Sequence, residues 1–133
     1  MPAVFTQVFK VRDYECDMQG VVNNSVYQNY LEHARHEYLL SRGVSFAAWT
    51  EADIHLVVVR AELDYLKPLV SGDSFEVTVR VHREGRLRLI FTQEIIRHAD
   101  GAMAVQARIV GTALKANKRP YFPDALLALI EDQ

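Results

Sequence analysis

The chain has 133 residues, of which half are hydrophobic and 24% are charged, a mixture typical of one globular domain with a single core. Its formal net charge of −2 does not favour nucleic-acid binding, which usually needs a basic domain. No apolar stretch approaches the roughly 18 residues of a membrane-spanning helix, the first residues lack the pattern of a signal peptide, and the single Cys16 excludes an internal disulfide framework. We therefore expect a soluble, cytoplasmic protein with one domain, residues 1–133.

The first predicted elements are a strand and a long helix. Residues 4–12 alternate between apolar and polar side chains, which predicts a strand. A loop follows, and then a helix from about Val26 to Arg42. Ser25 and Gln28 fit a capping box at its start, and Gly43 would end it. Apolar side chains recur along this helix at the spacing of one face: Tyr27, Tyr30, Leu31, Ala34 and Tyr38.

Strands dominate the rest of the chain after a short helical or irregular crossing at residues 45–53. Alternating side chains predict strands at residues 55–66, 74–83, 87–98 and 102–115. The clearest alternation places these apolar side chains on one face: Phe75, Val77, Val79 and Val81. In the strand before it, one face would carry Val57, Val59, Ala61, Leu63 and Tyr65.

Two turn signals and a proline complete the predicted elements. Glu84-Gly85-Arg86 and Ala99-Asp100-Gly101 favour antiparallel hairpins. Pro123 would begin a short amphipathic helix whose apolar side chains are Leu126, Leu127 and Ile130. The order predicts an α+β domain in which an antiparallel sheet of five strands, the last four in a meander, packs against one long helix. Because one helix covers only part of one face, we expect a dimer or a larger assembly.

The segment just before the long helix carries the chemistry. Asp17 and Gly20 stand where the unpaired N–H groups of a helix N-terminus attract negative charge and can polarise a carbonyl group. A carboxylate at such a position could attack the carbonyl carbon or activate water to do so. Gly20 would allow a close approach of backbone to substrate, since glycine tolerates unusual φ values.

Two motifs resemble those of a known family. Asp17-x-x-Gly20, two apolar residues and then a helix with Tyr27 and Tyr30 resemble the hotdog-fold thioesterases, in particular the branch of 4-hydroxybenzoyl-CoA thioesterase and the YbgC proteins. A second signature of that branch, a strand ending in Pro and followed by Gly-Asp, matches Pro68 and Gly72-Asp73. The resemblance covers nearly the whole chain and implies a hotdog fold, with a five-stranded antiparallel sheet around one long helix.

The same resemblance implies an acyl-CoA thioesterase that hydrolyses a thioester to a carboxylic acid and free coenzyme A. Asp17 would act as nucleophile or general base, and the backbone N–H near Asn24 would hold the thioester oxygen. Tyr27 and Tyr30 would line the acyl pocket, although aromatic stripes on helices more often belong to the core. No metal or organic cofactor is expected, because coenzyme A enters only as part of the substrate. The assembly would be a homodimer or a homotetramer.

Several basic residues are candidates for binding the phosphates of coenzyme A through charge-assisted contacts. The alternative is that these side chains are solvated cations at strand ends. The candidates are Arg86, Arg88, Lys115, Lys118 and Arg119.

One departure from the family pattern limits the mechanism and leaves alternatives open. Many relatives carry a histidine in the first motif, where this chain has Val21 and the pair Asn23-Asn24, so a mechanism that uses this histidine cannot be carried over. Its absence also counts against hotdog dehydratases. Hydrolysis of acyl groups on acyl carrier protein, or a non-catalytic acyl-binding module, remain the alternatives. The nearby His33 and His36-Glu37 do not match metalloprotease spacing.

Overall fold

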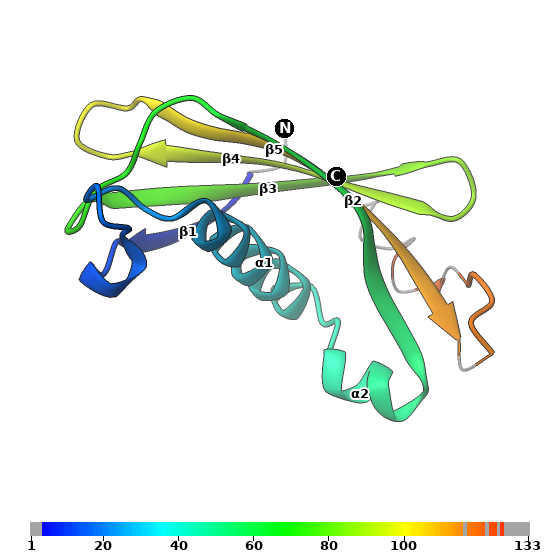
Figure 1. Ribbon diagram of the computed structural model, residues 1–133. Coiled ribbons are helices and arrows are strands. Elements are labelled where there is room, and N and C mark those ends of the chain that lie inside the picture. Colours follow the sequence, from blue (N-terminus) through cyan, green and yellow to red (C-terminus); the bar gives the residue numbers. More distant parts are fainter. Residues whose placement is uncertain (1–3, 116, 122, 125, 127–133) are drawn as a thin grey trace.

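The computed structural model describes residues 4–115, 117–121, 123–124 and 126. These residues form one long helix and an antiparallel sheet of five strands, as predicted (Figure 1). The elements in chain order are β1 (Phe5–Lys10), the 3₁₀ turn η1 (Asp13–Glu15), α1 (Asn24–Ser41), α2 (Phe46–Glu51), β2 (Ile54–Tyr65), β3 (Ser74–Glu84), β4 (Arg88–Arg97) and β5 (Met103–Lys115).

The strand order in the sheet is β1-β3-β4-β5-β2, so the predicted meander of four strands is wrong for β2. Tight turns join β3 to β4 and β4 to β5, whereas residues 66–73 between β2 and β3 contain Pro68 and no short hairpin turn. The chain therefore crosses over, and β2 pairs with β5 at the far edge, where Ile54 lies opposite Lys115 and Tyr65 opposite Val105.

A β-bulge changes which side chains of β2 face the helix. The register with β5 shifts between Val58 and Arg60, which leaves Val59 as an extra residue. Leu56 pairs with the buried Ala113, while Val57 pairs with Thr112 on the other face. The predicted single face of alternating residues is therefore wrong at Val57 and Val59, because one extra residue moves the preceding side chains to the opposite face.

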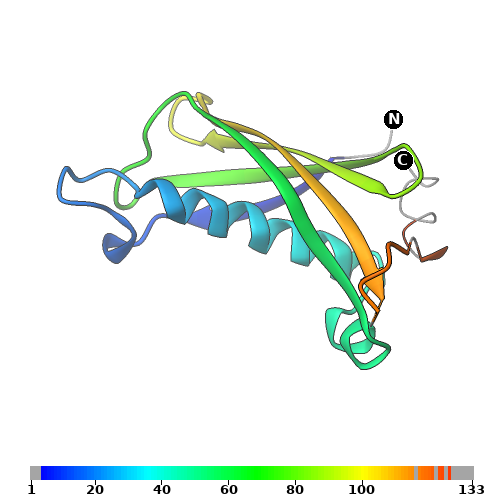
Figure 2. The same ribbon diagram turned by 45° about the vertical axis from the view of Figure 1, so that its right-hand side comes forward.

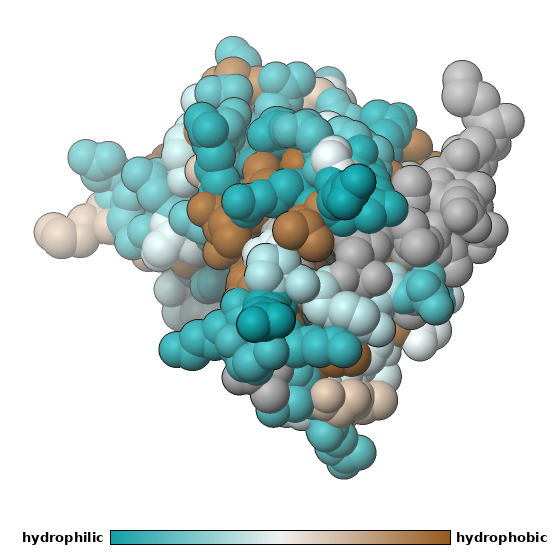
Figure 3. All heavy atoms as spheres, turned by 90° about the vertical axis from the view of Figure 1, so that its right-hand side faces the viewer, coloured by the Kyte–Doolittle hydropathy of each residue, from teal (hydrophilic) through white to brown (hydrophobic). Residues whose placement is uncertain are grey.

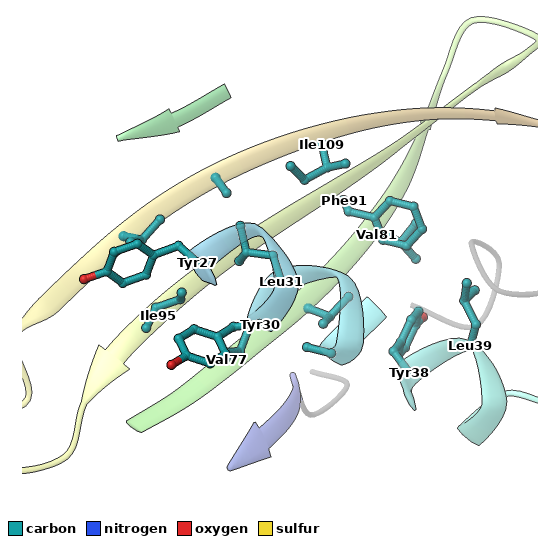
Figure 4. Packing of buried hydrophobic residues seen from close by; sticks show 14 of the residues in the cluster. Tyr27, Tyr30, Leu31, Tyr38, Leu39, Val77, Val81, Phe91, Ile95 and Ile109 are labelled. Carbon is teal, nitrogen blue, oxygen red and sulfur yellow. The ribbon is translucent and has the colours of Figure 1, made fainter. Parts of the chain in front are cut away.

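Helix α1 lies in the concave face of the curved sheet, and the core is between them (Figure 2). Figure 4 shows α1 side chains such as Leu31 over the strands that carry Val77 and Ile95. Leu31 and Ala34 are fully buried, as are Phe75 and Val77 of β3. The predicted stripe on α1 and the predicted face of β3 are thus the two halves of one core.

Helix α1 begins two residues earlier than predicted, and the predicted capping box of Ser25 and Gln28 is wrong. Asn23 is the N-cap: its backbone is extended (φ −64°, ψ 140°) and its side-chain oxygen accepts a hydrogen bond from the Ser25 N–H. Asparagine caps helices as well as serine does, so the sequence allowed either start. Gly43 follows the helix with φ +83°, a conformation that glycine adopts without strain.

The C-terminal helix predicted from Pro123 lies largely outside the described residues, as do Leu127 and Ile130. Leu126 is described: it is fully buried, and its N–H donates to the Pro123 carbonyl. Among the described residues, none of the helices has the length and apolar character needed to cross a membrane.

Replacing Leu31 by alanine should lower the free energy of unfolding by about 2–5 kcal/mol, because it opens a cavity between α1 and the sheet. Denaturation by urea, followed by circular dichroism, measures this change. Leu40 on the same helix is 53% exposed, so Leu40→Ala is a matched control that should cost less than about 0.5 kcal/mol. Equal losses for the two variants would contradict the packing described here.

Candidate active site

A small hairpin before α1 carries the Asp17 motif. The Asn23 N–H donates to the Glu15 carbonyl at 3.0 Å, and the Asp17 N–H donates to the Val21 carbonyl at 2.8 Å. The turn between them is closed by a hydrogen bond from the Gly20 N–H to the Asp17 carbonyl at 3.0 Å. Gly20 has φ +82° and open space around it, so backbone conformation rather than crowding favours glycine here.

The Asp17 carboxylate is exposed and is oriented by the backbone of its own turn. Its Oδ1 accepts a hydrogen bond from the Gln19 N–H at 2.8 Å and a longer one from the Val21 N–H at 3.4 Å. Its Oδ2 receives no hydrogen bond from the described part of the chain. One carboxylate oxygen is therefore held in place while the other is available to a water molecule or a substrate.

The first turn of α1 provides an unpaired backbone donor at Asn24. The N–H groups at a helix start have no partner within the helix. The Ser25 N–H is taken by the Asn23 side chain at 3.1 Å, and the Val26 N–H by the Asn23 carbonyl at 2.9 Å. The Asn24 N–H finds no acceptor among the described residues, so it can donate to a bound group.

The second signature lies against the first. The Val22 N–H donates to the Leu69 carbonyl at 2.9 Å, and Val21 forms a bridge with Val70. The Asp73 Oδ2 accepts a hydrogen bond from the Val70 N–H at 2.9 Å, which tightens the turn that leads into β3. Figures 1 and 2 both show these two loops side by side at the N-terminal end of α1. The two motifs recognised in the sequence thus form one structural unit.

Tyr27 and Tyr30 are both buried, in keeping with the core interpretation of the aromatic stripe. The Tyr27 hydroxyl accepts a hydrogen bond from the Leu69 N–H at 3.1 Å. The Tyr30 hydroxyl donates to Glu15 Oε1 at 2.8 Å, and its ring centre lies 4.7 Å from that of Phe75. Burial is the main cause that raises the pKa of both hydroxyls above the usual value. Both tyrosines therefore hold the loops around the site in place through these hydrogen bonds.

A pocket of about 240 Å³ opens beside the helix start. Neither Asp17 nor Gly20 lines it, but Asn24 and Tyr27 do. The Tyr65 hydroxyl lies 3.4 Å from the Asn24 carbonyl oxygen, to which it donates. Tyr65 and Lys67 were missed as site residues, although both immediately precede the second signature. The full lining is Val21, Val22, Asn24, Tyr27, Tyr65, Leu66, Lys67 and Pro68.

The five predicted phosphate-binding cations lie at the other end of the molecule. Arg86 and Arg88 belong to the β3–β4 hairpin, whereas Lys115, Lys118 and Arg119 lie at and after the end of β5. Because Ile54 pairs with Lys115 and Tyr65 pairs with Val105, the length of β2, roughly 35 Å, separates Lys115 from the Asn24 pocket. Arg88 lies toward the same end, since its neighbour Leu89 pairs with Gly111 of β5. Figure 3 looks onto their end of the molecule, where hydrophilic side chains cover much of the surface drawn in colour. Within one chain, the structure does not bring them to Asp17.

The two histidines of α1 are partly exposed, and each lies near an acid one turn away on the helix. His33 is 3.8 Å from Glu37, and His36 is 3.7 Å from Glu32. Within the described residues, no group of three His, Cys, Asp or Glu side chains could hold a metal ion.

Replacing Tyr27 by phenylalanine should lower the free energy of unfolding by about 1–3 kcal/mol, because the Leu69 N–H loses its acceptor in a buried position. Urea denaturation measures the change. Tyr65→Phe is the matched control, since Tyr65 is half-exposed and its hydrogen bond is long. If both variants were as stable as wild type, the Tyr27 hydroxyl would not anchor the second loop.

Comparison with known proteins places this chain in a family. Residues 11–130 match the Thioesterase-like superfamily. The long-chain acyl-CoA thioesterase FadM of Escherichia coli is 33% identical over 104 residues, which cover 78% of this chain and 77% of that protein. The chloroplastic acyl-acyl carrier protein thioesterase ATL3 of Arabidopsis thaliana is 36% identical over 111 residues, 84% of this chain but only 58% of that protein.

A solved structure shows the same fold. Slr0204, a 1,4-dihydroxy-2-naphthoyl-CoA thioesterase from Synechocystis, superimposes with a TM-score of 0.92 over 98% of this chain and 97% of its own, at 20% sequence identity. The chain therefore has the hotdog fold and belongs to the Thioesterase-like superfamily.

Proposed function

We propose that the protein is an acyl-CoA thioesterase, which hydrolyses an acyl-CoA to a carboxylic acid and free coenzyme A. The observation that carries this proposal is the hairpin before α1, which ends in an unpaired helix N–H and presents an exposed, oriented carboxylate. Membership of the superfamily and the similarity to FadM support it. The more specific assignment to the YbgC-like branch stays a prediction.

In the proposed mechanism, the Asn24 N–H donates to the thioester oxygen and stabilises the negative charge that develops there. A preorganised donor of this kind contributes about 3 kcal/mol to the transition state. The Asp17 carboxylate either takes a proton from water, which adds to the carbonyl carbon, or attacks that carbon itself and forms an anhydride that water then hydrolyses. The carbon–sulfur bond breaks, and the coenzyme A thiolate leaves. These steps need no metal or organic cofactor.

The same chemistry would serve an acyl group on acyl carrier protein, and the similarity to ATL3 favours testing this second candidate. The thioester and its surroundings are alike in both substrates, so only the carrier differs. Comparing thiol release from one acyl group on coenzyme A and on acyl carrier protein separates the two functions. A kcat/KM that is higher for the protein-bound substrate would favour the carrier-protein function.

We further propose that the active unit is a dimer formed along β2. This strand is at an edge of the sheet, and its Val58 and Val59 are about half exposed, as are Tyr65 and Leu66 just beyond. An unpaired apolar edge strand is a template for pairing with another chain. Antiparallel pairing of β2 with its copy would place the β5 end of one chain beside the Asn24 pocket of the other. Lys115 of the second copy could then reach the coenzyme A phosphates.

Light scattering should therefore give at least twice the chain mass of about 15 kDa. Val59→Lys, which puts a charge on the β2 edge, should shift the protein toward the monomer and lower thioesterase activity with it. Val8→Lys is the matched control: Val8 is 62% exposed on β1, at the opposite edge of the sheet. A stable wild-type monomer with full activity would overturn the dimer proposal.

Asp17→Asn should lower kcat by about a hundredfold to ten-thousandfold and change KM far less, because it removes the charge and keeps the shape. Thiol release from a panel of acyl-CoAs measures both constants. Asp124→Asn is the control, because Asp124 is exposed and lies outside both loops of the candidate site and outside β2. Near-normal turnover of folded Asp17→Asn would show that Asp17 is only a structural turn residue. Glu62 and Asp64 would then be the next catalytic candidates.

A further inference from the structure

A second cavity, of about 320 Å³, lies between α1 and the side of the sheet that contains β2. Its apolar lining comes from α1, β2, β4 and β5 and includes Leu39, Leu56, Ala61, Phe91 and Ile109. Its polar lining comes from α1, where Arg35 is the strong cation beside Gln28, Glu32 and His36. Such a cavity suits an apolar chain along most of its length, with a polar group at one defined position.

Arg35 is held in place by a buried partner. Its Nη1 donates to Gln93 Oε1 at 3.0 Å, and Gln93 Nε2 donates to the Leu31 carbonyl at 3.1 Å. Gln93 is fully buried on β4, so both of its hydrogen bonds fix the direction of the guanidinium. The guanidinium carbon lies 5.9 Å from the centre of the Phe91 ring. Burial lowers the pKa of Arg35 to about 10, so the group remains charged at neutral pH.

Most of the donor capacity of Arg35 is unused. A guanidinium has five N–H groups, and among the described residues only Gln93 accepts from it. No side-chain nitrogen that is fully buried in this part of the chain lacks a partner, so the remaining N–H groups reach the cavity or solvent. One acid of the same helix, Glu32, also lines the cavity, and its charge partly offsets the effect of burial on the pKa of Arg35. Glu32 is exposed and lies 3.7 Å from His36, and among the described residues no hydrogen bond joins it to Arg35. A charge in such apolar surroundings gains most from an oxygen acceptor, and above all from a carboxylate.

The cavity lies on the same helix face as the candidate catalytic donor. Asn24, Gln28, Arg35 and Leu39 share one face of α1 by helical spacing. Asn24 lines the first pocket and Gln28 the second. The Cα atoms of Asn24 and Arg35 are about 16 Å apart along the axis at 1.5 Å per residue, and the arginine side chain leans back toward the helix start. An extended acyl chain can follow this face from Asn24 toward Arg35.

We propose that this cavity receives the acyl group and that Arg35 selects acyl groups with an oxygen acceptor near their distal end, a carboxylate most strongly and a hydroxyl less so. This inference rests on the proposed thioesterase function, because it assumes that the thioester lies at Asn24. Arg35 is then a specificity-determining residue, and Gln93 positions it.

The test uses three series of acyl-CoAs matched in chain length and ending in methyl, hydroxyl or carboxylate, with chains from adipoyl to dodecanedioyl length. At one chain length, kcat/KM of the wild type should favour the carboxylate-ended chain over the methyl-ended chain by about tenfold. Arg35→Met keeps an apolar side chain and removes the donors, so this ratio should fall to about one while methyl-ended chains change less than about threefold. Arg80→Met is the control, since Arg80 is exposed on β3 between the buried Val79 and Val81.

A second variant covers the case in which Arg35→Met does not fold, as judged by circular dichroism. Gln93→Glu keeps an acceptor for Arg35 and puts a carboxylate where Gln93 Oε1 now lies, 3.0 Å from the guanidinium, at the loss of the hydrogen bond to the Leu31 carbonyl. The preference for carboxylate-ended chains should disappear in this variant, because the cation is already neutralised.

The outcomes separate the two proposals. If wild type hydrolyses the methyl-ended series but shows no preference at any length, or if folded Arg35→Met keeps the preference, the Arg35 inference is wrong and the thioesterase proposal stands. If wild type hydrolyses no acyl-CoA or acyl carrier protein thioester, the proposed function is wrong. Titration calorimetry of the same acyl-CoAs then decides the role of Arg35: it is upheld if Arg35→Met weakens binding of the oxygen-ended chains alone, and overturned otherwise.

Discussion

The candidate site depends on a helix start that is held firmly while one of its N–H groups remains unpaired. The Asn23 cap satisfies the Ser25 N–H, and the hydrogen bond between Tyr27 and Leu69 ties the helix to the loop before β3. The Val22 and Leu69 backbones join the hairpin to that same loop. These hydrogen bonds together fix the first turn of α1 and leave the Asn24 N–H as a donor that is held in place. A donor that need not move during reaction is what stabilises a developing oxyanion most.

The edge strand β2 has two roles in this arrangement. Its last residue, Tyr65, lines the pocket at the helix start, while Leu56 and Ala61 line the cavity that contains Arg35. Its outer edge is the apolar template on which we propose that a second copy pairs. The bulge at Val59 lies between Leu56 and Ala61 and changes which face the side chains on either side of it occupy. If both proposals hold, substrate binding and assembly are linked through one strand.

Local patterns allowed much of the fold to be predicted, whereas features that depend on distant contacts could not be. The alternation from Phe75 to Val81 and the apolar stripe on α1 each indicate a buried face, so the strand and the helix could be predicted from the sequence. The pairing of β2 with β5 is long-range, and a bulge such as that at Val59 changes no local composition. The unpaired N–H of Asn24 belongs to the backbone, so the type of amino acid at this position does not reveal it. Arg35 was missed because a lone arginine on a helix usually faces solvent.

We infer that a thioester binds with its oxygen on the Asn24 N–H and its carbonyl carbon within reach of the residue at position 17. A crystal structure of the Asp17→Asn variant with an uncleaved acyl-CoA tests it directly. We expect the thioester oxygen at about 2.9 Å from the Asn24 nitrogen, with the side chain of residue 17 facing the carbonyl carbon directly or through one water molecule. A thioester bound outside hydrogen-bonding distance of Asn24, or at another part of the surface, would show that the Asn24 N–H is not the oxyanion donor.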